Sequence, residues 1–373
     1  MDRREIEHLL AAIRKSRAAG EPAAVATVVR VRGSAYRREG TRMLVRQDGT
    51  YECALSGGCL EPAVAEAAAR VIATGEPSIV SYDLTDDSIW GLGIGCAGAV
   101  DIRIERIEDD AISNLWLEIL EQSKAAVLVT PLSVVSGRMI VSPSGEVDGA
   151  LTDPIVHQTA IAWARERLAA SYPQSSAERT AGADIFFEIA IPPPDLVIFG
   201  AGDDARPVVK LAWMLGLAVT VVDAREKLLT PERFPCAALV SAHHGQFANR
   251  VSLGSKSFAL IMNHHVERDR ESLRFCLESN AAHIGVLGPR ARFDRLLEGL
   301  ADDGYVPDAS KLSRVRSPVG LSLGAETPAE IAVSILAEVL AIQRGFEGGF
   351  LSGSAASLHR SEEREEKRLL ASS

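Results

Sequence analysis

The chain lacks three features that would point to common classes of partner. We find no stretch of about 18 apolar residues, and no basic segment followed by an apolar run near the start, so we expect no membrane span and no export signal. The formal net charge is −10, which disfavours nucleic acid as a partner, because phosphate binding needs a basic surface. Only five cysteines occur in 373 residues. An odd number in a chain of this size predicts reduced thiols and a cytoplasmic location.

The length and the prolines predict the domain organisation. A chain of 373 residues with 47% hydrophobic residues is large enough for two or three domains with ordinary cores. Three consecutive prolines occur in residues 191–195, and proline continues neither a helix nor a ladder, so we interpret this segment as a stiff linker. It divides an N-terminal α/β domain, residues 1–190, from a C-terminal domain, residues 196–345. Residues 346–373 are polar and charged and are expected to be a mobile tail or a solvated helix.

The C-terminal domain has the pattern of a doubly wound, Rossmann-like parallel sheet. An apolar run at 196–199 precedes a glycine-containing turn, a helix near 206–215 and a second apolar strand at 218–222. Such short, wholly apolar strands are typical of parallel sheets that are covered on both faces. Further strands are expected at 237–241, 258–262 and 283–287.

This domain also carries a dinucleotide-type fingerprint. Gly200 and Gly202 open the helix, and Asp223 ends the next strand 21 residues beyond Gly202. In such a motif the glycines let phosphate approach the helix start, and the acidic residue binds ribose hydroxyls. Arg225 is a candidate for a 2′-phosphate or for neutralising nearby acids, and His264 follows a strand at the edge where ligands bind. The alternative is a Rossmann-type scaffold that holds another ligand or none.

The N-terminal domain contains an internal repeat. Residues 42–45 and 54–56 align with residues 138–141 and 150–152, always 96 positions apart, and alanine-rich helices follow near 61–74 and 155–170. Alternating strands are expected at the ends, at 100–105 and 184–189. We infer two pseudo-repeats, about 20–108 and 122–190. The first copy has about six extra residues within 32–40, and it has Gly57-Gly58-Cys59 where the second has Asp153-Pro154-Ile155.

Two cysteines lie in glycine-rich loops of the first copy. Cys59 follows Ser56, Gly57 and Gly58 and comes just before a helix, whose N-terminus favours a thiolate. Cys96 lies between Gly95 and Ala97-Gly98. We interpret both as functional thiols, since glycine lets a ligand approach the backbone closely. The alternative, a small core residue, is the interpretation for Cys53, Cys236 and Cys276.

Three arginines, Arg37, Arg38 and Arg42, lie beside Gly33 and Gly40. Guanidinium groups suit a phosphate or the polar edge of a pterin. A solvated hairpin is an equally good interpretation of this cluster.

Together these residues resemble the xanthine dehydrogenase accessory protein family, also called XdhC/CoxI. The matching segments are 33–34, 40–43, 56–61, 82–84, 92–96, 200–209, 223–225, 262–264, 285–288, Arg290, 318–321, 324–328 and 330–332. Small departures from the family pattern are Ala97, Asn263 and Pro289.

The resemblance implies a maturation chaperone rather than a turnover enzyme. Family members bind molybdenum cofactor, help it acquire a sulfido ligand with a cysteine desulfurase, protect it and pass it to an apo molybdenum hydroxylase of the xanthine or CO dehydrogenase type. A homodimer formed through the helix near 329–341 is also expected. The alternative is an NAD(P)-dependent oxidoreductase. The residues expected to bind cofactor are Ser56, Gly57, Gly58, Cys59, Glu61, Arg42, Cys96, Gly200, Gly202, Asp223, Arg225 and His264, with Cys59 and Cys96 as metal ligands.

Overall fold

The computed structural model describes residues 1–84, 98–133, 135–170 and 172–353. These residues form two compact units, one from Met1 to Pro192 and one that begins at Pro193. The division falls within the triple-proline segment. Cys96 lies outside the described residues, as does the tail beyond residue 353.

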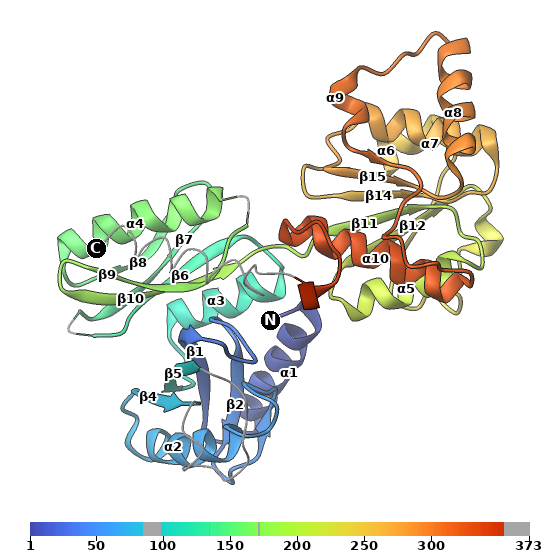
Figure 1. The fold of residues 1–373 in the computed structure, drawn as a ribbon. Coiled ribbons are helices and arrows are strands. Elements are labelled where there is room, and N and C mark those ends of the chain that lie inside the picture. The colour runs from blue at the N-terminus through green and yellow to red at the C-terminus, as the bar shows by residue number, and fades with distance from the viewer. Residues whose placement is uncertain (85–97, 134, 171, 354–373) are drawn as a thin grey trace. The chain divides into compact units, whose positions relative to one another are not determined.

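The first unit contains two five-stranded antiparallel sheets with the same strand order. Sheet A has the order β3-β2-β1-β5-β4, and sheet B has the order β8-β7-β6-β10-β9 (Figure 1). The strands of sheet A are β1 (Ala23–Gly33), β2 (Arg42–Arg46), β3 (Tyr51–Glu52), β4 (Ser78–Asp83) and β5 (Gly98–Arg106), and helix α2 (Glu61–Thr74) lies between β3 and β4 in the chain. The strands of sheet B are β6 (Ala126–Pro131), β7 (Gly137–Val141), β8 (Val147–Leu151), β9 (Ser176–Thr180) and β10 (Ala183–Ala190), and helix α4 (Pro154–Ala169) lies between β8 and β9 in the chain. The shared order supports the predicted duplication, because each element of one copy has a counterpart in the other.

Each sheet is covered by two helices. In β1, Ala24 and Ala26 face a core built with α2, whereas Ala23 and Val25 face α1 (Arg3–Ala19). This alternation is the period of two that a strand imposes on its side chains. In sheet B, α4 and α3 (Ala111–Glu121) cover opposite faces in the same way. The central strands, β1 and β2 in sheet A and β6 in sheet B, are therefore buried on both sides even though they are antiparallel.

Reciprocal ion pairs join the two copies. Arg42 on β2 bonds Glu188 on β10, and its counterpart Arg138 on β7 reaches Glu105 on β5, at 3.8 Å. In each copy, an arginine on the second strand thus forms an ion pair with a carboxylate on the last strand of the other copy. The Arg42–Glu188 pair is buried, with both side chains 9% exposed. Burial raises the pKa of Glu188 more than the Arg42 guanidinium lowers it.

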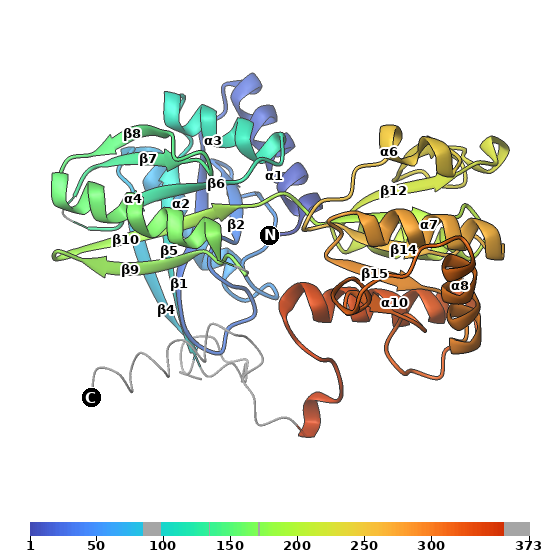
Figure 2. The same cartoon turned by 90° about the horizontal axis from the view of Figure 1, so that it is seen from above.

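The second unit is a six-stranded parallel sheet of order β13-β12-β11-β14-β15-β16. Helices α5 and α10 pack on one face and α7 and α8 on the other (Figure 1), and Figure 2 looks onto the face that α7 covers. The strands are β11 (Asp195–Phe199), β12 (Ala218–Asp223), β13 (Ala238–Ser241), β14 (Phe258–Ile261), β15 (His283–Val286) and β16 (Val315–Arg316). The α-helices are α5 (Ala205–Met214), α6 (Phe247–Arg250), α7 (Val266–Glu278), α8 (Arg290–Asp302), α9 (Ala309–Leu312) and α10 (Pro328–Arg344), and the 3-10 helices are η1 (Glu226–Leu228), η2 (His244–Gln246) and η3 (Leu351–Gly353). The predicted fold class is confirmed.

Two expectations concern surfaces. The apolar face of α10, including Ile335, Leu336 and Val339, packs in the core of its own unit with α5, and the homodimer expected through the helix near 329–341 stays a prediction. Among the described residues, no helix is both long enough and apolar enough to cross a membrane.

The buried pair gives a first prediction. In Glu188→Gln the Arg42 charge stays buried without its partner, so we expect the free energy of unfolding to fall by about 3–5 kcal/mol. The double variant Arg42→Met/Glu188→Leu removes both charges and should lie much closer to the wild type. Urea unfolding followed by tryptophan fluorescence measures this, since Trp116 lies 6.0 Å from the Arg42 guanidinium.

The matched control is Arg14→Met, which breaks an exposed pair with Glu121 and should cost at most about 1 kcal/mol. A Glu188→Gln protein as stable as this control would show that the buried pair does not hold the copies together.

Candidate functional site

The segment between β3 and α2 is organised around one hydroxyl group. Ser56 Oγ accepts hydrogen bonds from the backbone N–H groups of Gly58, Cys59 and Leu60, at 3.2, 3.2 and 3.1 Å. The turn requires glycine at position 58, where φ is +108° and a side chain would be strained. Ser56 thereby satisfies donors just before the start of α2 that would otherwise lack partners.

A buried carboxylate holds this serine. Glu61 Oε1 accepts from the backbone N–H groups of Leu55 and Ser56, at 2.9 and 2.7 Å, and Glu61 Oε2 accepts from the Ser56 hydroxyl at 2.5 Å. Burial alone would raise the pKa of Glu61, but the hydrogen bonds from Ser56 and Leu55 outweigh it and lower the pKa. At neutral pH Glu61 is therefore an ionised anchor for the loop, and only 1% of its surface is exposed.

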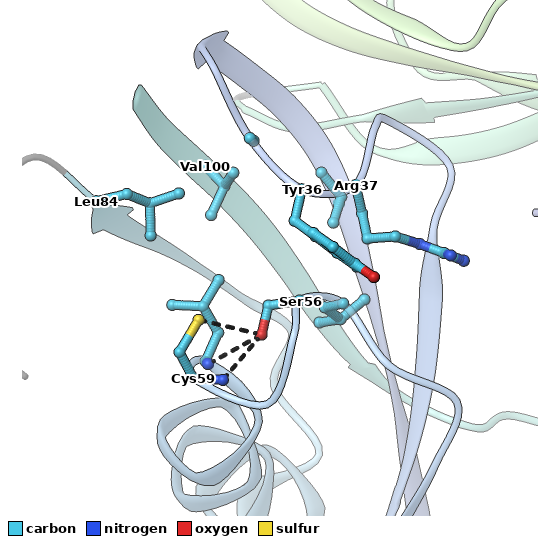
Figure 3. A pocket seen from close by; sticks show the side chains of 10 residues that line it. Tyr36, Arg37, Ser56, Cys59, Leu84 and Val100 are labelled. Carbon is cyan, nitrogen blue, oxygen red and sulfur yellow. Dashed lines mark hydrogen bonds between the residues drawn. The ribbon is translucent and has the colours of Figure 1, made fainter. Parts of the chain in front are cut away.

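The thiol of Cys59 lies beside this network, in the lining of a small cavity. Its Sγ is 3.3 Å from Ser56 Oγ, and a dashed line marks this contact in Figure 3. The cavity volume is about 20 Å³, which is the room that one water molecule needs. The lining residues are Val28, Ala35, Tyr36, Arg37, Leu55, Ser56, Cys59, Leu60, Leu84 and Val100. An atom or a small group fits against the thiol, whereas anything larger would extend outside.

Of the three arginines in the predicted cluster, only Arg37 lines the cavity. Its guanidinium is paired with Glu5 of α1. Arg42 is 8% exposed and faces Glu188. The structure thus places Arg42 in the junction between the two copies and not in the cavity lining at Cys59.

The second copy has no equivalent of this site. At the start of α4, Asp153 accepts from the backbone N–H groups of Ile155 and Val156, at 2.8 and 3.0 Å, and is an ordinary N-cap. The sequence has no cysteine there and no counterpart of the extra residues in 32–40. The same topology therefore supports a thiol-lined cavity in one copy only.

In the second unit, Gly200 of the fingerprint allows the chain after β11 to approach the chain after β14 closely. A Cβ at Gly200, where φ is +124°, would lie 2.5 Å from the Met262 carbonyl oxygen, and one at Gly202 would lie 2.4 Å from Asp204 Oδ1. This edge is the point at which the strand order reverses, since β12 and β14 flank β11. Ligands of such sheets bind at this position.

Asp223 is fully engaged by the protein. Its carboxylate accepts from the backbone N–H groups of Ala201 and Arg225, both at 2.8 Å, and from Arg225 Nε and Nη2, at 2.9 and 2.6 Å. Burial alone would raise the pKa of Asp223, but these hydrogen bonds outweigh burial, so the pKa is lowered and the carboxylate stays ionised. The residue that we expected to bind ribose is 3% exposed and ties the glycine turn to β12.

His264 also lies at this edge, in contact with an acid that follows the glycines. Its Nε2 is 2.6 Å from Asp204 Oδ2, and its backbone has φ of +60°, an uncommon conformation for a residue other than glycine. Asp269, five residues further along the chain, bonds Asn263 and Arg292.

The structure thus places the expected site residues in separate groups. One loop holds Ser56, Gly57, Gly58, Cys59 and Glu61, and the carboxyl edge of the parallel sheet holds Gly200, Gly202, Asp223, Arg225 and His264. Within the described ranges, no group of three or more His, Cys, Asp or Glu side chains forms a metal site.

Tyr36 lines the cavity but was not predicted from the sequence as a site residue. The signal was present, because Tyr36 belongs to the segment that only the first copy carries.

Comparison with known proteins shows which family the chain belongs to. Residues 16–83 match the model of the XdhC and CoxI family, and residues 196–339 match that of the XdhC Rossmann domain. A Bacillus subtilis protein, named as a probable subunit of xanthine dehydrogenase, is 31% identical over 83% of this chain and 89% of its own length. The chain belongs to the XdhC and CoxI family.

Two other relatives of this XdhC and CoxI family member extend the comparison. The Escherichia coli molybdenum cofactor insertion chaperone PaoD is 23% identical over 81% of this chain and 77% of its own length. A Bacillus halodurans crystal structure, described as a xanthine dehydrogenase, superposes with a TM-score of 0.74 at 31% identity and covers 95% of this chain and 98% of that one.

The Glu61 network gives a prediction for pH dependence. The pKa of this carboxyl is lowered in the folded state, so its contribution to stability is present above the unfolded value, about 4.3, and is lost as pH falls through the folded value. Glu61→Gln should therefore be less stable than the wild type at pH 7, and the difference should shrink toward about pH 3. Urea unfolding at several pH values measures it.

Glu66→Gln, at an exposed position of the same helix, is the control and should follow the wild-type profile. A Glu61→Gln deficit that stays constant from pH 7 to pH 3 would contradict the assignment of Glu61 as an ionised anchor.

Proposed function

We propose that this protein binds molybdenum cofactor as cargo at Cys59, helps it acquire its sulfido ligand, protects it, and delivers it to an apo molybdenum hydroxylase. The observation that carries the proposal is the Cys59 thiol in a cavity that only one of two equivalent copies possesses. A fold that needed this loop only for stability would not require the difference, because Asp153 caps the same helix start in the second copy with no thiol.

The residues present fit the molybdenum end of such a cargo. A thiolate is a soft ligand that suits a metal bound through sulfur. The cavity has room for an atom or a small group beside Sγ, so most of the cargo would stay outside it. No set of three protein ligands is present among the described residues, which agrees with a metal that arrives carrying most of its own ligands.

The loop would hold the thiol in place for capture and release. Cys59 N–H and Sγ both contact Ser56 Oγ, and Ser56 is fixed by Glu61, so the sulfur is positioned before the cargo arrives. One protein ligand gives a contact that can be exchanged, as transfer to an apoenzyme requires. The name of the E. coli relative, molybdenum cofactor insertion chaperone, supports this assignment.

The proposal includes partners and a place of action. A cysteine desulfurase would supply sulfur, the client would be an enzyme of the xanthine or CO dehydrogenase type, and the work would take place in the cytoplasm. The protein is then a maturation chaperone rather than a turnover enzyme. We assign no nucleotide to the Rossmann-like unit in this function, because Asp223 and Arg225 bind each other.

The test is retention of molybdenum cofactor after anaerobic mixing and desalting, with molybdenum and pterin fluorescence measured in the protein fraction. The wild type should retain both in a fixed ratio. Cys59→Ser should lower retention at least about tenfold, because loss of a metal ligand costs no less than loss of a residue that merely orients one.

Cys53→Ser is the matched control, since Cys53 is a free, partly buried thiol of the same region whose pKa burial raises to about 11. Cys96→Ser, assayed in parallel, shows whether the second glycine-loop thiol also binds. A wild type that retains neither molybdenum nor pterin, yet binds NAD(P), would favour the oxidoreductase alternative.

A further inference from the structure

Tyr36 lies at the cavity of Cys59 with most of its ring in solvent. It is 72% exposed, and it lines the same cavity as Ser56 and Cys59 (Figure 3). Aromatic residues make up only 5% of the chain, so a largely exposed tyrosine at the mouth of a cavity is uncommon here. An exposed ring provides a face on which a flat conjugated group can stack.

The segment that carries Tyr36 is fixed on both sides. The neighbouring Ala35 is 9% exposed and packs in the core under α2, and Arg37 is paired with Glu5. Farther along, Glu39 Oε1 accepts from the Val31 N–H at 3.0 Å. With its neighbours held in place, the backbone that carries the ring is already ordered before a ligand binds.

Tyr36 also comes from the part of the first copy that the second copy lacks. The extra residues within 32–40 and the Gly57-Gly58-Cys59 loop are both absent from the second copy. The structure brings these two differences together in one cavity. The Tyr36 segment and the Cys59 thiol are both present in one copy and missing from the other. Both differences are explained if the two residues contact the same ligand.

We propose that Tyr36 is a specificity-determining residue that stacks against the flat conjugated ring of the cargo. Since the cavity admits only an atom or a small group, any ring attached to that group must lie outside it, where Tyr36 is. The identity of this ring as a pterin rests on the proposed function. Tyr36 then lets the protein distinguish a metal that carries a ring from a bare oxyanion of the metal.

Fluorescence titration with free, metal-free pterin tests this directly. Tyr36→Ala should weaken pterin binding about tenfold, in line with the loss of a base from an aromatic stack. Tyr36→Phe keeps the ring and should bind like the wild type. Tyr51→Ala, which removes a ring 43% exposed on β3 of the same sheet, is the matched control and should change nothing. Because Tyr36 is largely exposed, all three variants should melt at the wild-type temperature.

A second measurement uses the same variants with released molybdenum cofactor and with molybdate. Tyr36→Ala should retain less cofactor, while binding of molybdate stays the same as in the wild type. A loss for pterin or for cofactor that Tyr36→Phe restores supports the proposal. The proposal is overturned if Tyr36→Ala binds both free pterin and cofactor as the wild type does, or if Tyr36→Phe loses binding as Tyr36→Ala does. It is also overturned if the wild type binds neither free pterin nor cofactor.

These outcomes separate the two proposals. If Cys59→Ser loses cofactor while Tyr36→Ala keeps both cofactor and free pterin, the proposed function stands and the stacking role is wrong. If wild type fails to retain cofactor but binds free pterin through Tyr36, the stacking role stands and the molybdenum proposal is wrong.

Discussion

The candidate site depends on one buried carboxylate. Glu61 accepts three hydrogen bonds from Leu55 and Ser56, and Ser56 in turn accepts three backbone N–H groups that precede α2. The position of Cys59 is a consequence of this chain of contacts, because both its N–H and its sulfur face the Ser56 hydroxyl. Such a network is costly if any member is missing, since a buried polar group without a partner loses its hydration with nothing in return. The thiol is therefore held by the same interactions that start the helix.

Duplication provides the scaffold on which this loop could diverge. Two sheets of identical order are joined by reciprocal arginine–carboxylate contacts, Arg42 with Glu188 and Arg138 with Glu105. The second copy retains the capped helix and the packed sheet. The first copy carries in addition a glycine-rich turn and an exposed aromatic ring, which cost conformational entropy without adding to a core.

The sequence predicted the repeats, the helix at 61–74 and the parallel sheet, because hydrophobic periodicity and glycine placement are local signals. It could not predict the partners of charged residues. Arg42 attracted attention as a possible cofactor ligand, but its alignment with Arg138 already indicated a role that both copies share. Tyr36 was missed because nothing local distinguishes a tyrosine that lines a cavity from one on an open hairpin. Only the fold brings residues 35–37, 55–60 and 84 around the same space.

In the Rossmann-like unit, residues of the dinucleotide-type fingerprint contact other residues of the same unit. Gly200 is required where it is because the Met262 carbonyl leaves no room for a side chain and φ is +124°. A Cβ at Gly202 would meet the Asp204 carboxylate, which lies at the end of a flexible side chain. Asp223 is required because it accepts the Ala201 N–H, and the Arg225 guanidinium neutralises its charge. Gly200, Asp223 and Arg225 thus have structural reasons to be present that involve no nucleotide, and the acid that would bind ribose is buried. Among the chemistry that such structural reasons leave unexplained is the Cys59 loop. There, a thiol and an exposed aromatic ring border one cavity and have no counterpart in the second copy.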